Sequence, residues 1–171
     1  AIDGFRTRGV RSIIIDLRGN PGGMGGMAIP VAARLVDKPL TLGTIQFRDF
    51  GQTLTTTPSL GVKPYLGRVF ILTDEGSAST SELFAAGLQE AKRATVVGDF
   101  TLGAVLPSAI EALPAGAVLQ YVVADFRTPK GVLVEGKGVT PDRRVLETRM
   151  GFASGRDVVL DAALALARAS K

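Results

Sequence analysis

The chain has 171 residues, enough for one domain with a hydrophobic core and too few for two domains of typical size. Hydrophobic residues make up 46% and charged residues 21%, which excludes a disordered or collagen-like chain. The net charge of +4 comes from scattered Lys and Arg, so the charge pattern gives no support to nucleic-acid binding. The longest uncharged stretch, residues 19–33, is interrupted by Gly and Pro and is too short for a membrane span.

Two residue types are missing, and their absence narrows the possible chemistry. Without Cys there can be no disulfide, thiolate metal site or Cys nucleophile. Without His the chain cannot complete a Ser-His-Asp triad or offer an imidazole to zinc. We therefore expect no metal and no cofactor, and any catalysis must use another base or one supplied from elsewhere.

Apolar periodicity and turn residues predict the elements. In chain order they are a helix at 1–8, a strand at 10–16, a glycine-rich turn at 17–26, a helix at 29–36, strands at 40–47, 53–57 and 68–73, a helix at 79–92, strands at 94–97 and 118–126, and a closing helix at 158–169. Strands mixed with helices predict an α/β domain whose sheet is covered by helices. No repeat or linker divides residues 1–171, so a single domain is expected. The opening residues have no signal-peptide pattern and resemble the end of a helix, which suggests a fragment that lacks its N-terminal portion.

The segment from residue 68 to 93 places Ser79 where a strand has ended and a helix begins. Backbone N–H groups at a helix N-terminus are unsatisfied, so an oxyanion formed beside Ser79 would be stabilised there. Ser79 and Glu82 also fit the capping box, in which the serine caps the helix and the glutamate binds back to its N–H. On spacing alone the capping box is favoured over a nucleophile.

The turn LRGNPGGMGG lacks both the GxGxxG spacing and the GxxxxGK[ST] pattern, so nucleotide binding is weakly supported. A tight turn needs one or two glycines, whereas this segment has five. Such permissive backbone costs conformational entropy on folding, so we expect another group to approach this backbone closely.

The segments IIIDLRGNPGG and VFILTDEGSASTSELFAAGLQEAKRATVVGDFTLG closely resemble the C-terminal processing (tail-specific) protease family, whose relatives include tricorn protease and the interphotoreceptor retinoid-binding protein. The later segment TPKGVLVEGKGVTPD resembles the closing motif of that family. The resemblance implies an α/β fold of the Clp protease/crotonase-like type, a β-β-α superhelix. It covers most of the chain.

Carried over by position, the resemblance implies that Ser79 is the nucleophile and that Glu82 supports it. The N–H of Thr80 would form one half of the oxyanion hole. The other half would come from the N–H of Gly22 or Gly23 in the glycine turn. This implication reverses the preference for a simple capping box at Ser79.

The sequence departs from the family pattern at Ala104, which stands where the processing proteases have a catalytic lysine. A Ser/Lys dyad of that type is therefore absent. The tricorn-like branch instead uses a histidine from an upstream segment, oriented by a serine and by a glutamate that matches Glu135 here. On that branch the histidine lies before Ala1. Without the resemblance, Glu135 would be interpreted as a solvated turn carboxylate.

The favoured hypothesis is a serine endopeptidase that cleaves polypeptides through an acyl-enzyme on Ser79. The resemblance implies a periplasmic or cell-envelope location, and it leaves homo-oligomerisation open. A non-catalytic ligand- or peptide-binding module on the same fold is the alternative, and Ala104 favours it. A crotonase-like acyl-CoA enzyme is a weaker third hypothesis, since the GSASTSE segment argues against it.

Overall fold

The computed structural model describes residues 1–58 and 61–169. Its elements in chain order are α1 (Ile2–Thr7), β1 (Ser12–Asp16), the 3-10 helix η1 (Gly25–Met27), α2 (Ala28–Ala33), β2 (Leu40–Phe47), β3 (Gly51–Thr56), β4 (Arg68–Thr73), α3 (Thr80–Glu90), β5 (Ala94–Gly98), β6 (Ser108–Ala112), the 3-10 helix η2 (Pro114–Gly116), β7 (Val118–Val122), β8 (Ala124–Arg127), β9 (Arg143–Arg144), α4 (Arg149–Ala153) and α5 (Val158–Ala169). Within these residues the strands form a parallel sheet in the order β1-β4-β5-β9, a three-stranded antiparallel sheet in the order β3-β2-β8, and a β6-β7 hairpin.

Strand β4 lies at the centre of the parallel sheet and is buried on both faces. Its side chains alternate, so Val69 and Ile71 join the core around α3, while Phe70 and Leu72 pack with α5 on the opposite face. A continuous apolar run is what a strand covered on both faces requires, which explains the sequence RVFILT.

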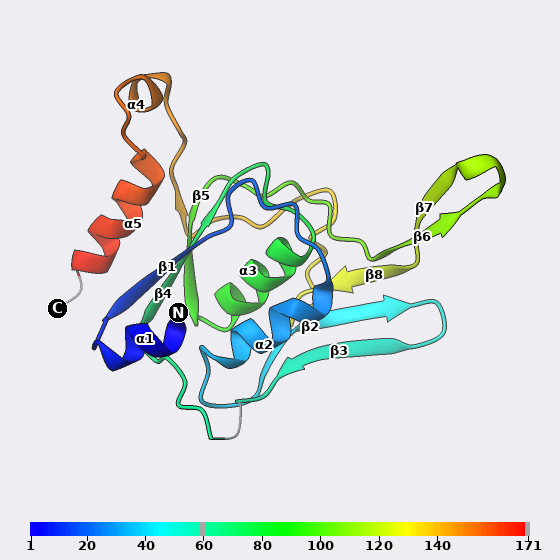
Figure 1. The fold of residues 1–171 in the computed structure, drawn as a ribbon, viewed down its shortest axis with the longest axis horizontal. Coiled ribbons are helices and arrows are strands. Elements are labelled where there is room, and N and C mark those ends of the chain that lie inside the picture. Colours follow the sequence, from blue (N-terminus) through cyan, green and yellow to red (C-terminus); the bar gives the residue numbers. More distant parts are fainter. Residues whose placement is uncertain (59–60, 170–171) are drawn as a thin grey trace.

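Helix α3 lies between the parallel sheet and the three-stranded sheet, next to α2 (Figure 1). Nearly every side chain from Ser81 to Leu88 is buried, as expected for a helix enclosed between two layers. A Cβ at Gly87 would lie 2.7 Å from the Leu42 backbone, so glycine is needed for the close approach of α3 to β2.

The helix and strand expectations are largely confirmed, and the strands predicted at 40–47 and 68–73 match β2 and β4 at both ends. The prediction at 118–126 is wrong in one respect, because the chain breaks there into β7 and β8. Strand β7 pairs with β6, which was not predicted, whereas β8 pairs with β2. The β6-β7 hairpin projects from the body of the molecule (Figure 1). Helix α4 and the short strand β9 were also not predicted.

The helices are short. In the described part of the chain, none is both long and apolar enough to cross a lipid bilayer.

Candidate active site

Three loops meet at the carboxyl edge of the parallel sheet. Strands β1, β4 and β5 are parallel and end next to one another. The loops that follow them therefore begin at the same edge of the sheet. These loops comprise residues 17–23, 74–79 and 99–105. A crevice outside the carboxyl ends of parallel strands is the usual place for a ligand site in an α/β sheet.

Hydrogen bonds tie the first of these loops to the second. The Asp74 Oδ1 atom accepts a hydrogen bond from the Gly19 N–H at 2.8 Å. The Asn20 carbonyl oxygen accepts from the Ala78 N–H at 3.0 Å and from the Ser81 hydroxyl at 3.1 Å. The glycine turn is therefore fixed against the start of α3, as the sequence led us to expect of two segments that share a site.

Ser79 lies at the N-terminus of α3 with φ 54° and ψ −118°, a conformation that residues with a Cβ rarely adopt. Its N–H donates to Glu82 Oε2 at 2.9 Å and to the Ala104 carbonyl oxygen at 3.0 Å. The capping box is thus present. Its glutamate side chain accepts a hydrogen bond from the Ser79 N–H. Its serine side chain lies near the backbone of Glu82 but makes no cap hydrogen bond within the described residues.

The Glu82 carboxylate is fully buried and accepts four hydrogen bonds. Oε1 accepts from the Thr101 hydroxyl at 2.5 Å and from the Gly103 N–H at 2.7 Å. Oε2 accepts from the Ser79 N–H at 2.9 Å and from the Ala104 N–H at 3.0 Å. A buried carboxylate satisfied in this way can be tolerated, and it fixes the third loop to the start of α3.

The glycine turn packs directly on Ser79. A Cβ at Gly22, whose φ is +87°, would lie 2.8 Å from Ser79 Cβ and 2.7 Å from both Ala78 O and Thr80 N. Only glycine fits this position, which confirms that a group approaches the turn closely. The Gly22 N–H itself is occupied, because it donates to Asn20 Oδ1 at 2.9 Å.

Two backbone donors beside Ser79 remain available. The Thr80 hydroxyl donates to the Gly23 carbonyl oxygen at 2.7 Å, which keeps the two residues side by side. In residues 1–58 and 61–169, neither the Gly23 N–H nor the Thr80 N–H donates to another protein group. Two free N–H groups next to a serine are the elements of an oxyanion hole.

A cavity of about 270 Å³ opens beside these donors and is lined by Gly23 and Thr80. Most of the remaining lining is apolar and includes Leu17, Met24, Met27, Val31 and Phe84. Met24 is 77% exposed and Met27 is 56% exposed, so these flexible side chains border the opening.

The half-buried Glu135 carboxylate binds backbone N–H groups. Its Oε2 accepts from the Val105 N–H at 2.8 Å and from the Leu106 N–H at 3.3 Å. These residues follow Ala104, whose carbonyl oxygen accepts from the Ser79 N–H. Glu135 therefore holds the loop that carries Ala104 against Ser79. The side chain of Ala104 is exposed and offers no base.

Comparison with known proteins identifies the family to which this chain belongs. The family model described as "Peptidase family S41" matches residues 1–145. This chain belongs to peptidase family S41. A "Probable CtpA-like serine protease" of Staphylococcus haemolyticus is 34% identical over 137 residues, which cover 80% of this chain and 28% of that protein. The chain thus spans less than a third of this S41 relative.

Solved structures agree with the S41 assignment. The photosystem II D1 C-terminal processing protease superposes with a TM-score of 0.73 at 28% identity, covering 85% of this chain and 37% of that one. Tricorn protease shares the fold, with a TM-score of 0.64 at 20% identity over 92% of this chain and 15% of that one. The α/β fold expected from the resemblance, of the Clp protease/crotonase-like type, is confirmed.

The structure brings together Ser79, Thr80, Glu82, Gly22 and Gly23, and it connects Glu135 to them through the loop after β5. No group of His, Cys, Asp and Glu suited to hold a metal occurs within the residues described.

Two connections were missed by the sequence reasoning. The Thr101 hydroxyl donates to Glu82, as noted, and accepts from the Val139 N–H at 2.7 Å. Asp142 accepts from the Val96 N–H of β5 at 2.8 Å. No local pattern could have revealed either contact, because each pair is separated by dozens of residues.

Proposed function

We propose that this chain is the catalytic domain of a serine endopeptidase that cleaves polypeptides through an acyl-enzyme on Ser79. The observation that carries the proposal is the strained backbone of Ser79 beside two free N–H groups, those of Thr80 and Gly23. Strain of this kind persists at functional sites where the surroundings enforce it. Membership of a peptidase family supports the same conclusion.

In the proposed reaction the Ser79 hydroxyl oxygen attacks the carbonyl carbon of the scissile peptide bond while a base accepts its proton. The carbonyl oxygen becomes an oxyanion held by the Thr80 and Gly23 N–H groups. The C–N bond then breaks, and the amine leaves with the proton from the base. Water hydrolyses the ester by the same steps and releases the new carboxyl terminus.

Three further residues have supporting roles in this proposal. Gly22 lets the turn lie against Ser79, and its engaged N–H favours Gly23 as the second oxyanion donor. Glu82 fixes the Ser79 backbone through its N–H. Glu135 acts on the neighbouring loop, where it binds the N–H groups of residues 105 and 106.

The general base is the group that this chain does not supply. The chain has no His, and Ala104 offers only a methyl group where the family has lysine. We propose that the base comes from outside residues 1–171, as in the tricorn-like branch. The alternative, a binding module that lost its chemistry, predicts that Ser79→Ala leaves function intact.

The apolar cavity supports a preference for substrates with an apolar side chain next to the scissile bond. Gly23 and Thr80 line the cavity, so a residue whose carbonyl oxygen lies in the oxyanion hole would direct its side chain there. Met24 and Met27 can adapt to Leu, Met or Phe at that position. A location in the cell envelope or periplasm belongs to this proposal.

The Ala104→Lys variant tests the proposal, because it returns a lysine to the loop bound to Ser79. We expect it to cleave fluorogenic peptides with Leu or Met before the scissile bond, and cleavage should rise with pH as the ammonium loses its proton. Peptides with Asp at that position should be cleaved far more slowly. The double variant Ser79→Ala/Ala104→Lys is the matched control. Cleavage that is equal in both variants, or absent in both at every pH, contradicts the proposal.

A further inference from the structure

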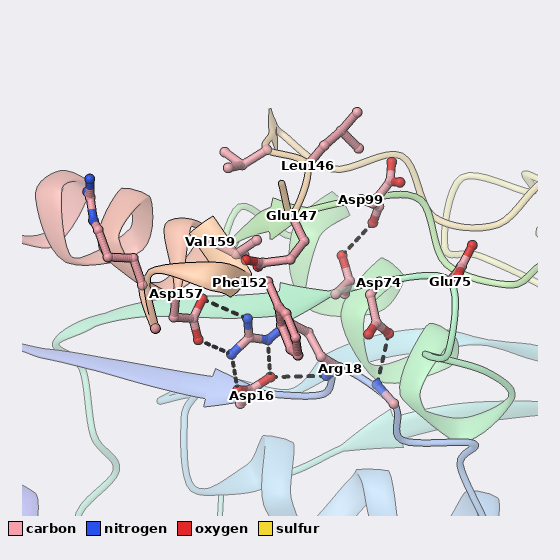
Figure 2. Close-up of a pocket in the computed structure, with 15 residues that line it drawn as sticks. Asp16, Arg18, Asp74, Glu75, Asp99, Leu146, Glu147, Phe152, Asp157 and Val159 are labelled. Carbon is pink, nitrogen blue, oxygen red and sulfur yellow. Dashed lines mark hydrogen bonds and ion pairs between the residues drawn. The ribbon is translucent and has the colours of Figure 1, made fainter. Parts of the chain in front are cut away.

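Arg18 forms a doubly bidentate ion pair at the beginning of the glycine turn (Figure 2). Its Nε and Nη2 atoms donate to Asp16 Oδ1 at 2.9 Å and Oδ2 at 2.7 Å. Its Nη1 and Nη2 atoms donate to Asp157 Oδ1 at 2.8 Å and Oδ2 at 2.7 Å. The planar guanidinium matches two carboxylates at once, which a lysine could not do.

Asp157 connects this ion pair to helix α5. Its Oδ1 atom accepts from the Leu160 N–H at 2.8 Å, so it caps the first turn of the helix. Val159 and Ala163 of α5 are buried against the parallel sheet. The carboxylate that binds Arg18 is therefore held by a helix with its own packing, and it lies 139 residues away in sequence.

On its other side, Arg18 leads directly into the turn that packs on Ser79. The Arg18 N–H donates to Asp16 Oδ1 at 3.1 Å, and the next N–H, that of Gly19, donates to Asp74 Oδ1 at 2.8 Å. Gly19 has φ +63°, so the chain reverses immediately after the ion pair. Arg18 is therefore joined to the turn through consecutive backbone N–H groups that are both held by carboxylates.

The ion pair borders open space instead of packed core. Arg18, Gly19 and Asp157 line a cavity of about 930 Å³ (Figure 2), and none of the three lines the apolar cavity. The contact between Arg18 and Asp157 joins the beginning of the turn to the start of α5 at the edge of this cavity.

We propose that Arg18 and Asp157 are positioning residues, through which helix α5 restrains the glycine turn that supplies the Gly23 N–H. This inference rests on the proposed function for the role of Gly23. Asp157 lies beyond residues 1–145, the part of the chain that the family model matches.

The test uses the full chain with Asp157→Asn and a matched control. Asn is as good an N-cap as Asp, so the variant loses the charge and keeps the cap. Asp16 still pairs with Arg18 in this variant, and no charge is left isolated. The control is Asp161→Asn on the same helix, which removes an exposed ion pair with Arg156 at 3.0 Å.

Two measurements are made on each variant. The first is amide hydrogen exchange in residues 19–23, and the second is the rate at which a fluorophosphonate labels Ser79. For Asp157→Asn we expect exchange roughly three- to tenfold faster and labelling slower by a similar factor, the range expected for loss of a partly exposed bidentate pair. Asp161→Asn should match the wild type in both. Arg18→Lys keeps the charge but loses the planar guanidinium that donates two hydrogen bonds to each carboxylate. It should behave like Asp157→Asn.

Unchanged exchange in residues 19–23 of both Asp157→Asn and Arg18→Lys overturns the inference. Faster amide exchange in residues 19–23 with an unchanged rate of Ser79 labelling also contradicts the positioning role. If the wild-type chain itself never labels at Ser79, the proposed function fails instead, and the exchange data still report whether α5 restrains the turn.

Discussion

The backbone of Ser79 adopts φ 54° and ψ −118°, which costs about 1–3 kcal/mol in a residue with a Cβ. The surroundings enforce this conformation. The Ser79 N–H is held by Glu82 and by the Ala104 carbonyl oxygen, and Gly22 packs against its Cβ. A serine that only capped a helix would have an extended conformation and would not need such enforcement.

This strain predicts different stabilities for two substitutions at the same position. Ser79→Gly should be about 1 kcal/mol more stable than Ser79→Ala, because glycine relieves strain that exceeds its own entropic cost. Both variants lose the hydroxyl, so the comparison isolates the backbone. Urea unfolding of the two proteins measures the difference, and equal unfolding midpoints would show that Ser79 is unstrained.

At the scale of single elements, the glycine turn and the start of α3 act together as one unit. The turn needs glycine at residue 22 for reasons of space, whereas a Cβ at Gly26 would meet nothing within 4 Å. Gly26 also has no positive φ. These two glycines of the same segment therefore provide a matched pair.

Gly22→Ala should destabilise the protein by about 2 kcal/mol or more, because the new methyl group overlaps Ala78 O and Thr80 N. It should also abolish fluorophosphonate labelling of Ser79. Gly26→Ala should leave labelling intact and stabilise the chain by about 0.5 kcal/mol. Thermal unfolding and mass spectrometry check both effects. Similar behaviour of the two variants would mean that the turn does not pack on Ser79 as described.

Helix α5 and strand β1 are connected by charges whose contribution depends on pH. Hydrogen bonds from the Arg18 guanidinium are the largest cause that lowers the pKa of Asp16 and of Asp157 below the ordinary value. A carboxylate whose folded-state pKa is lowered stabilises the fold above its unfolded pKa. This contribution disappears as the pH falls through the folded-state pKa.

The wild type should therefore exceed Asp157→Asn in free energy of unfolding by a constant amount above about pH 5, and the difference should shrink as the pH falls below about 4. Urea unfolding of both proteins between about pH 3 and pH 7 measures this. A difference that stays constant over the whole range would show that the pKa of Asp157 is not lowered.

At the scale of the whole molecule, the sequence predicted the layers better than the connections between them. Strand β4 is an apolar run, and β2 alternates apolar residues with Thr and Gln; both have distinct ends, so their limits could be predicted to the residue. The apolar run at 118–126 was predicted as one strand. Periodicity cannot show that its first part, β7, pairs in a hairpin and that its second part, β8, pairs with β2.

The same limit applies to the site. The residues of the proposed site could be named because three segments carry a family resemblance. Three of the four hydrogen bonds of Glu82, and the ion pair of Arg18 with Asp157, depend on loops that only the folded sheet brings together. The resemblance therefore predicted the residues of the proposed site, while tertiary structure determines how they are held.

The most direct test of the account is the site at which a fluorophosphonate modifies the wild-type chain. The reagent forms a bond between a serine oxygen and phosphorus as fluoride leaves, and oxyanion donors accelerate this step. Peptide mapping by mass spectrometry after long exposure at alkaline pH should locate the adduct on Ser79, ahead of every other serine. An adduct spread evenly over the serines, or concentrated on one other than Ser79, would contradict the account.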